Sequence, residues 1–474
     1  MSMSWRSVLS GILFSAGLGG CSVGPDYHAP KPAVSGTWAE NSPGVTTNAP
    51  LELTEWWKTL GDPLLSSLME RAVGSNYDLK AAEARLRAAR ALRGAVVADF
   101  IPTVGAGASY STARRSRNAT TSPMQLVDTD TYQAGFDASW EIDVFGGKRR
   151  SLEAATADTQ AVEANLQGVR VSLLAEVARY YVEYRGAQRR LAIARQNLEA
   201  QQETVDITQL RFDKGLASEL EVAQAKILLA STKSQIPALE TDLKQSSHRM
   251  CVLLGLPPGA LESELATENP IPGTPPEVPA GLPSDLLRRR PDVRSSERQL
   301  AGATARIGVA TAELFPKFFL TGAAGYQSLD AAAWFEPASK YWSAGPSVRW
   351  RLLEFPRLKA LVNAQTARQE ELLAQFNQTV LLSLEEVENA LVAYAKERER
   401  YQSLQEAVES SRRSVVLANE LYLKGVGEFL NVLLDQRALY QAEDALAQSQ
   451  RDVTQDLVAL YKALGGGWDP APTN

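Results

Sequence analysis

Few side chains in this sequence of 474 residues could hold a metal ion or act as a general base near neutral pH. There are two histidines, His28 and His248, and two cysteines, Cys21 and Cys251. A structural zinc site takes about four such ligands, and a catalytic triad needs a histidine beside its nucleophile. The sequence therefore leaves almost no room for a His/Cys metal centre or a histidine-based triad. We predict neither an enzyme nor a bound cofactor.

Cys21 is the side chain with the most specific chemistry. It closes the segment "LGGC" directly after an apolar run, Val8–Leu18, that is too short to span a bilayer. This pattern resembles a bacterial lipobox, in which the cysteine is acylated and becomes the mature N-terminus. A plain secretory signal with a chance cysteine is the alternative. We predict a palmitate-type lipid on Cys21, with Ser22 favouring delivery to the outer membrane and Cys251 left as a buried free thiol.

The charge balance excludes one class of partner. With 49 Lys and Arg against 55 Asp and Glu, the formal net charge is −6, whereas a nucleic-acid-binding face would need the opposite sign. Beyond the N-terminal run, no apolar segment is long enough for a transmembrane helix. If the chain crosses a membrane, it must therefore do so with β-strands.

The chain consists of two similar halves. Three features recur 210 residues apart: Trp140 and Trp350, the pairs Lys214-Gly215 and Lys424-Gly425, and Gly255 and Gly465. A fixed offset of this kind indicates an internal structural repeat. We divide the chain into a signal peptide 1–20, an acylated tail 21–63, a first repeat 64–256, a proline-rich linker 257–283 without regular structure, a second repeat 284–468 and a C-terminal tail 469–474.

Each half is predicted to begin with a helix, which a proline ends, followed by two strands. The first strand is rich in Gly, Ala and Thr. The second, which reads "TYQAGFDASWEIDV" in the first half, has an apolar side chain at every other residue. The expected helices run from Leu64 to about Ala98 and from Ser284 to about Leu314, and the expected strands cover 103–111, 131–144, 317–327 and 341–352.

The alternation places aromatic residues on one face of these strands and Gln, Asp, Glu, Arg and Ser on the other. This is the pattern of a transmembrane barrel with a wet interior, although a soluble sheet packed on a helix would also alternate. Four strands cannot close a barrel, and open edges are not tolerated in lipid. We therefore predict that several chains pool their strands in multiples of four, with twelve strands from a ring of three, and that these side chains face the membrane: Tyr132, Phe136, Trp140, Trp342 and Trp350.

The remainder of each half is predicted to be a long helical hairpin. No proline or glycine interrupts the segment from Arg357 to Lys424, and its apolar positions recur every seven residues, which makes neighbouring helices supercoil. Such a helix is on the order of 100 Å long. A Lys-Gly turn then reverses each chain into a second helix, Ser218 to about Leu254 or Glu428 to about Leu464. A closed ring of these hairpins would form a tube.

Two segments tie these features to a known family: "EWWKTLGDPLLSSLMERAVGSNYDLKAAEARLRAARA" and "GLPSDLLRRRPDVRSSERQLAGATARIGVATAELFPKFFL". They closely resemble the outer-membrane factor (TolC-like) family, specifically its NodT-like lipoprotein branch, and the resemblance runs from about Cys21 to Trp468. It implies a mainly α fold with a transmembrane β-barrel. In a homotrimer, four strands per chain complete a twelve-stranded barrel, and the coiled hairpins form an α-barrel in the periplasm.

The resemblance also implies a function. The chain would be the exit duct of a tripartite efflux pump, lipid-anchored in the cell outer membrane with most of its length in the periplasm. Its partners would be a periplasmic adaptor protein, a proton-driven inner-membrane transporter and outer-membrane lipids. It would passively conduct small molecules such as drugs and so contribute to antibiotic resistance. A duct for type I protein secretion is the nearest alternative; a free-standing porin and a non-conducting coiled-coil lipoprotein are more distant ones.

Site residues follow from the same resemblance. The helix-reversal turns are expected to contact the adaptor through Lys214, Gly215, Lys424 and Gly425. Tyr422 matches a family tyrosine that bonds to a carboxylate, for which this chain offers Glu221. A hydrogen bond between the two would latch the closed tips at ~1.5–3 kcal/mol. A purely packing role for Tyr422 in the heptad is the equal alternative.

The narrowest point of the duct is where this sequence departs from the family. That point often carries acidic residues, but here Asn431 and Leu434 occupy the positions where Asp is expected. Asp435 follows one step later, about 100° around the helix. We therefore predict a gate with an apolar constriction in place of an acidic ring, and only weak block of conductance by divalent cations.

Overall fold

The computed structural model describes residues 22–32, 35–40, 45–46, 53–114, 116, 128–275, 278–279 and 281–469. The predicted signal peptide 1–20 and the predicted lipidation site Cys21 lie outside the described residues. The chain forms two compact units, each assembled from three segments. The first comprises Met1–Lys31, Leu86–Val162 and Ser296–Phe376, and the second comprises Pro32–Arg85, Glu163–Ser295 and Asn377–Asn474.

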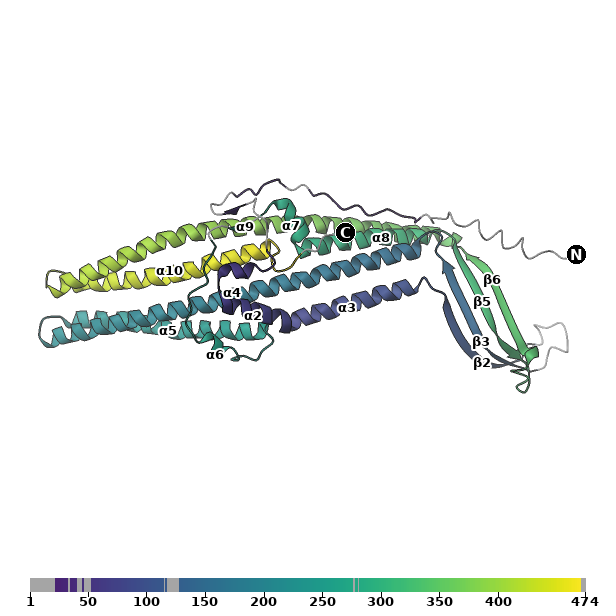
Figure 1. The fold of residues 1–474 in the computed structure, drawn as a ribbon, viewed down its shortest axis with the longest axis horizontal. Coiled ribbons are helices and arrows are strands. Elements are labelled where there is room, and N and C mark those ends of the chain that lie inside the picture. Colours follow the sequence, from purple (N-terminus) through teal and green to yellow (C-terminus); the bar gives the residue numbers. More distant parts are fainter. Residues whose placement is uncertain are drawn as a thin grey trace. The chain divides into compact units, whose positions relative to one another are not determined.

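The helices follow the two halves of the sequence (Figure 1). The first half contains α2 (Pro63–Ser75), α3 (Tyr77–Ala98), α4 (Gly147–Asp213) and α5 (Glu219–Leu253), and the second contains α7 (Pro283–Arg289), α8 (Pro291–Ala312), α9 (Phe355–Leu423) and α10 (Phe429–Ala463). The bounds of α5 and α10 differ by 210 residues at both ends, which confirms the predicted repeat. None of the described helices is both long enough and apolar enough to cross a membrane.

The single leading helix predicted for each half is wrong, because each is broken once. In the first half, Asn76 ends α2 and its side-chain oxygen accepts a hydrogen bond from the amide of Leu79 at 2.9 Å, which caps α3. In the second half, Pro291 holds Arg290 in an extended conformation (ψ 119°) and starts α8 afresh. Asn and Pro are both common at the start of helices, so both breaks could have been predicted from the sequence.

The long helices end at glycines with a left-handed backbone. Gly215 (φ 73°) follows α4 and Gly425 (φ 74°) follows α9. The amide after each glycine donates to the carbonyl five residues earlier, at 2.8 Å and 3.1 Å respectively. This is the Schellman motif, which glycine enters without the strain that a Cβ would cause. The predicted Lys-Gly reversals are therefore confirmed as turns, and α4/α5 and α9/α10 are helical hairpins.

The strands form one antiparallel sheet in the order β2-β3-β5-β6 (Figure 1). Its strands are β2 (Thr103–Ala113), β3 (Thr129–Ile142), β5 (Lys317–Ser328) and β6 (Lys340–Arg349). The central pair, β3 with β5, joins the two halves of the sequence in a single sheet. The outer edges of β2 and β6 pair with no strand in the described part of the chain. This arrangement confirms the predicted class of long helices with four strands per chain.

The linker 257–283 contains regular structure, contrary to the prediction. The helix α6 (Glu262–Leu265) lies within it, and the two-residue strand β4 (Val278–Pro279) pairs with β1 (Val45–Thr46). Both elements are short enough to fit among the prolines. Fully buried Arg185 of α4 fixes the linker by donating to the carbonyls of Leu265 and Thr267, at 3.4 and 2.8 Å.

The specific segment "LRRRPDVR" joins the start of α8 to the end of α10. Arg290 donates to the carbonyl of Ala463, the last residue of α10, at 3.1 Å. Its guanidinium also forms ion pairs with Asp292 and Glu386, at 2.6 and 2.5 Å. A cation at a helix C-terminus satisfies free carbonyls and complements the helix dipole. The segment therefore has a structural role in the second unit.

Candidate functional sites: the sheet and the hairpin tips

The pairing register puts the aromatic side chains of the strands on one face of the sheet. Phe136 of β3 lies opposite Ala324 of β5, which lies opposite Trp342 of β6, and Trp140 lies opposite Leu320. Directly paired residues share a face. Large side chains of this apolar face that are exposed in the described chain are Val104, Tyr110, Phe136, Trp140, Leu320, Trp342 and Val348. The face offers a nearly continuous apolar surface.

Two tryptophans hold matching positions at the end of this face next to the helices. The indole nitrogen of Trp140 donates to the carbonyl of Phe100 at 2.9 Å, and that of Trp350 donates to Leu314 at 3.0 Å. Both acceptors come just after a helix, α3 or α8. A ring with an apolar body and a hydrogen-bonded tip suits the boundary between lipid and water.

A second group of rings lies at the other end of the strands. Tyr132 lies 5.0 Å from Tyr110 and 5.6 Å from Trp334, between ring centroids, and Trp334 stacks on Phe335 at 4.8 Å. The hydroxyl of Tyr110 donates to Asp130 at 3.0 Å. Two aromatic bands around an apolar middle are what transmembrane strands present to a bilayer.

The opposite face of the sheet is polar. Gln133 donates to the hydroxyl of Tyr341 at 3.0 Å, and the guanidinium of Arg349 lies 5.0 Å from the ring centre of Phe319. Near its end, Lys317 forms an ion pair with Glu313, whose carboxylate also accepts from Arg351 at 3.0 Å. Such a face is suited to water, as the alternation predicts.

In the first unit, the start of the described chain packs closely against its neighbours. The amide of Val23 donates to the carbonyl of Phe145 at 3.1 Å, and buried Arg150 donates to the carbonyl of Val23 and to the carboxylate of Asp26, at 3.2 and 2.6 Å. A Cβ on Gly24 would lie 2.4 Å from the Cα of Gly308. The residues that follow Cys21 are therefore closely fitted against this unit.

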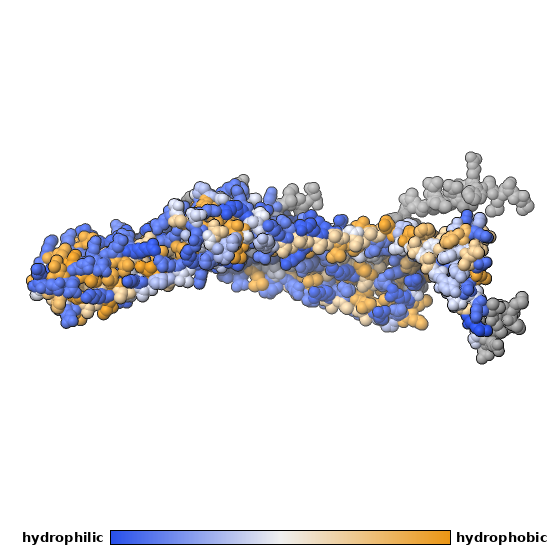
Figure 2. Space-filling model, turned by 90° about the horizontal axis from the view of Figure 1, so that it is seen from below, coloured by the Kyte–Doolittle hydropathy of each residue, from blue (hydrophilic) through white to orange (hydrophobic). Residues whose placement is uncertain are grey.

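The turns at the hairpin tips present exposed apolar side chains. Leu216 is 68% exposed and Val426 is 75% exposed, one residue after each turn glycine. Lys214 and Lys424 precede those glycines and are also exposed. Figure 2 shows apolar patches between hydrophilic ones over this end of the hairpins. Mixed apolar and charged surface of this kind is typical of interaction sites.

The predicted hydrogen bond between Tyr422 and Glu221 is not formed. Glu221 instead caps α5: its carboxylate accepts from the amide of Ser218 at 2.8 Å, and its own amide donates to the Ser218 hydroxyl. The Tyr422 hydroxyl is buried without a partner among the described residues. Burial raises the pKa of Tyr422, and the nearby Arg211 guanidinium opposes that rise.

The Tyr422 ring, rather than its hydroxyl, joins the two hairpins. It lies 4.7 Å from the guanidinium carbon of Arg211 on α4 and 5.1 Å from the Phe429 ring on α10. Together with Val205 and Val432 it belongs to a buried apolar cluster near the tips. A cation over an aromatic face is worth about 0.5–2 kcal/mol. Arg211 was not among the residues expected at the tips. Its place in the heptad repeat of α4 was the only signal in the sequence that could have indicated it.

The three residues expected at the constriction differ in exposure and bonding. Asn431 and Leu434 are exposed on α10, and Leu434 is 52% exposed. Asp435 is half-buried and accepts a hydrogen bond from the Ser414 hydroxyl of α9 at 2.8 Å. The only carboxylate of the three is therefore engaged with its own hairpin, while an aliphatic side chain and an amide remain exposed.

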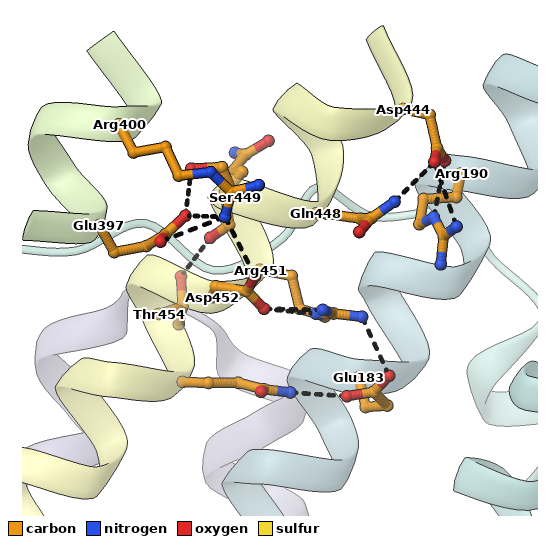
Figure 3. A network of polar contacts seen from close by, with 12 residues as sticks. Glu183, Arg190, Glu397, Arg400, Asp444, Gln448, Ser449, Arg451, Asp452 and Thr454 are labelled. Atoms are coloured by element: carbon orange, nitrogen blue, oxygen red, sulfur yellow. Dashed lines mark hydrogen bonds and ion pairs between the residues drawn. The ribbon is translucent and has the colours of Figure 1, made fainter. Parts of the chain in front are cut away.

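The described residues offer no group of three or more His, Cys, Asp and Glu side chains that could hold a metal ion. Carboxylates between the hairpins are used in ion pairs instead (Figure 3). Arg190 of α4 binds Asp444 of α10 at 2.7 Å, and Arg451 of α10 binds Glu183 of α4 at 3.3 Å. These contacts join helices and assemble no reaction centre.

The chain matches the family model of outer membrane efflux proteins over residues 68–256 and 282–466. It belongs to the outer membrane efflux protein family. Nodulation protein T of Rhizobium leguminosarum bv. trifolii is 31% identical over 462 residues, covering 96% of this chain and 97% of that protein. The pyoverdine export outer membrane protein OpmQ of Pseudomonas aeruginosa is 33% identical, with 99% and 98% covered.

A solved structure gives the same result. The outer-membrane channel OprN is similar with a TM-score of 0.89 at 38% identity, and the match covers 94% of this chain and all of that one. This outer membrane efflux protein is therefore a TolC-like channel of the outer membrane. It serves as the exit duct of an efflux pump and is not an enzyme.

Proposed function

We propose that three copies of this chain assemble into one lipid-anchored duct, which passively conducts small molecules after an adaptor protein docks on the hairpin tips. The observation that carries the proposal is the sheet: it has an aromatic face, a polar face and two outer edges, on β2 and β6, that pair with no strand among the described residues. Open strand edges are not tolerated in lipid, and three sheets of this kind make a twelve-stranded barrel with a lumen.

The architecture supports the proposed partners. The exposed turns after Gly215 and Gly425 supply the surface for a periplasmic adaptor, and an inner-membrane, proton-driven transporter supplies the energy that a passive duct lacks. Acyl chains on Cys21 would anchor the assembly, since two or more chains give stable membrane attachment. The hydrogen bonds of Arg150 to Val23 and Asp26 support this anchor, because they fix the segment that would follow the lipid.

Small molecules are the favoured cargo. The relative OpmQ is named for export of pyoverdine, and this chain is similar to it over nearly its whole length. Resistance to small toxic compounds, antibiotics among them, would follow. Protein secretion is the second candidate for the same duct, and a non-conducting spacer is disfavoured because it leaves the aromatic face of the sheet without a role.

Single-particle imaging of the protein extracted from outer membranes tests the assembly. We expect a hollow, three-fold particle with a short collar and a tube on the order of 100 Å long. A monomer or a solid rod would contradict the proposal. Deleting the gene and measuring both small-molecule accumulation and protein export then separates the two cargo classes.

A further inference from the structure

The core shared by the two hairpins contains a layer of incompletely bonded polar side chains. Gln201 of α4 is only 2% exposed, yet neither its amide nitrogen nor its amide oxygen has a partner among the described residues. Gln436 of α10 donates to the hydroxyl of Thr204 at 2.8 Å, but its own amide oxygen is buried without a donor. We call Gln201, Thr204 and Gln436 the polar layer.

Further buried polar atoms without hydrogen-bond partners lie between the polar layer and the tips. The Tyr422 hydroxyl and the Nε atom of Arg211 are also buried without partners. Of eleven such side-chain atoms in the described part of the chain, five belong to Gln201, Gln436, Arg211 and Tyr422. A buried polar atom without a hydrogen bond destabilises the packed state, because water would satisfy it in the open state.

On the other side of the polar layer, away from the tips, charged side chains join the two hairpins, although Arg185 and Tyr394 there also have a buried side-chain atom without a partner among the described residues. Arg190 makes two bonds to Asp444, at 2.7 and 3.2 Å (Figure 3), and Asn197 donates to Glu443 at 3.1 Å. These charge-assisted bonds resist separation. Between Asn197 and Gln201, within about one helical turn, the bonding between α4 and α10 therefore changes from charge-assisted contacts to the neutral hydrogen bond of Gln436 to Thr204.

We propose that the polar layer is the release point at which the two hairpins part when the tips open. Opening hydrates the four side chains with unpaired atoms and exposes the apolar cluster around Val205 and Val432, so the two effects oppose each other. The ion pair of Arg190 stops the separation from spreading further. This inference rests on the proposed function, in which the tips open, and adds where they divide.

A buried glutamine in a coiled coil can also serve only to fix register. A register device, however, works through hydrogen bonds that form in the correct pairing alone, and Gln201 makes none in the described chain. The two roles also predict different effects of an apolar replacement. A release point predicts tighter closure, whereas a register device predicts a mixture of pairings.

The test is hydrogen exchange by mass spectrometry on the full-length, acylated protein in lipid nanodiscs. In the double variant Gln201→Met/Gln436→Met, we expect backbone exchange of residues 205–225 and 420–437 to slow by at least five-fold. Gln188→Met is the matched control: Gln188 is a buried α4 glutamine whose amide accepts from Arg185 at 2.6 Å and donates to Leu265 at 3.1 Å. That variant should not slow exchange at the tips.

A second variant, expected to change the exchange rate in the opposite direction, distinguishes the proposal from a folding defect in the double variant. Val432→Gln adds another amide to the buried cluster and should speed tip exchange. Unchanged or faster exchange in the double variant overturns the release point, and so does a mixture of exchange patterns along both hairpins. If exchange slows while conductance and efflux keep their unaltered values, the release point stands and the proposed gating by the tips fails.

Discussion

Single side chains at the hairpin tips differ in which of their atoms make contacts. The carboxylate of Glu221 is used by the cap of α5, and the carboxylate of Asp435 is used by Ser414. Tyr422 contributes its ring to Arg211 and Phe429 and leaves its hydroxyl unpaired. Contacts between the hairpins at the tips therefore depend on ring packing more than on hydrogen bonds.

Replacing Tyr422 by two different residues separates these contributions. Tyr422→Phe removes only an unbonded hydroxyl, so single-channel conductance in bilayers should stay at or below its unaltered value. Tyr422→Leu loses the cation–π and ring contacts, about 1–2 kcal/mol, and should raise the open probability several-fold. A rise in conductance with Tyr422→Phe would instead revive the hydrogen-bonded latch.

Asp456 of α10 makes folding stability depend on pH. Burial and the carboxylates of Glu397 and Asp452 raise its pKa to about 6 from an ordinary 3.8. The folded state therefore disfavours the charged form, and stability is lost as the pH rises from about 4 through 6. After discounting for partial exposure, Asp456→Asn should stabilise the protein by about 1 kcal/mol at pH 8 and have little effect at pH 4.

Thermal unfolding at pH 4, 6 and 8 measures this effect. Asp444→Asn is the control, because Asp444 forms an ion pair with Arg190 at 2.7 Å and its loss should give no gain at pH 8. An equal gain from Asp456→Asn at every pH would mean that packing, and not titration, is responsible.

At the scale of elements, the ends of helices are set by a few residue types. Gly215 and Gly425 occupy left-handed positions after α4 and α9, and Gly465 (φ 74°) does so after α10. The surroundings of the glycines differ, however. A Cβ on Gly425 would meet open space, whereas one on Gly465 would lie 2.9 Å from the carbonyl oxygen of Arg289.

The effects of alanine at these glycines should differ accordingly. Gly425→Ala pays only the left-handed backbone penalty, about 1 kcal/mol, and should loosen the tip locally. Gly465→Ala adds a clash with backbone and should lower the melting temperature of the whole protein clearly more. Thermal unfolding of both variants gives the comparison, and equal shifts would contradict it.

Much of the element plan was readable from sequence, because periodicity and breakers are local signals. The offset of 210 residues, the alternating strands and the Lys-Gly reversals needed no tertiary information. The breaks at Asn76 and Pro291 were also legible but were missed. The packing of Arg211 on Tyr422 and the bonding of Arg185 to the linker were not, because both join segments that are distant in sequence.

At the scale of the whole molecule, the proposed duct requires more than one copy of the chain. In the described part of the chain, the outer edges of β2 and β6 pair with no strand, and the apolar face of the sheet is exposed. The aromatic face of the sheet could be predicted from alternation alone. The lining of the duct could not, because which helix face meets the lumen depends on neighbouring copies.

The constriction gives a prediction at this scale. With Leu434 exposed and Asp435 bonded to Ser414, divalent cations should block the conductance of the assembled duct only weakly. Leu434→Asp in every copy would create a ring of carboxylates and should lower the blocking concentration at least ten-fold. Planar-bilayer recordings with added Mg²⁺ or Co²⁺ measure it. Strong block of the unaltered duct that Asp435→Asn abolishes would contradict the apolar constriction.

The two hairpins are similar in plan but end differently. At the first tip, Ser218 caps α5 in a capping box, whereas at the second tip the N-cap residue of α10, Glu428, makes no side-chain cap hydrogen bond. Pro237 lies within α5, and α10 has Ala447 at the matching place. A ring of three chains would therefore alternate two kinds of tip around its rim. A protein that bound every tip would have to recognise two chemically distinct surfaces. A mutation that altered one kind of tip would leave the three tips of the other kind unchanged.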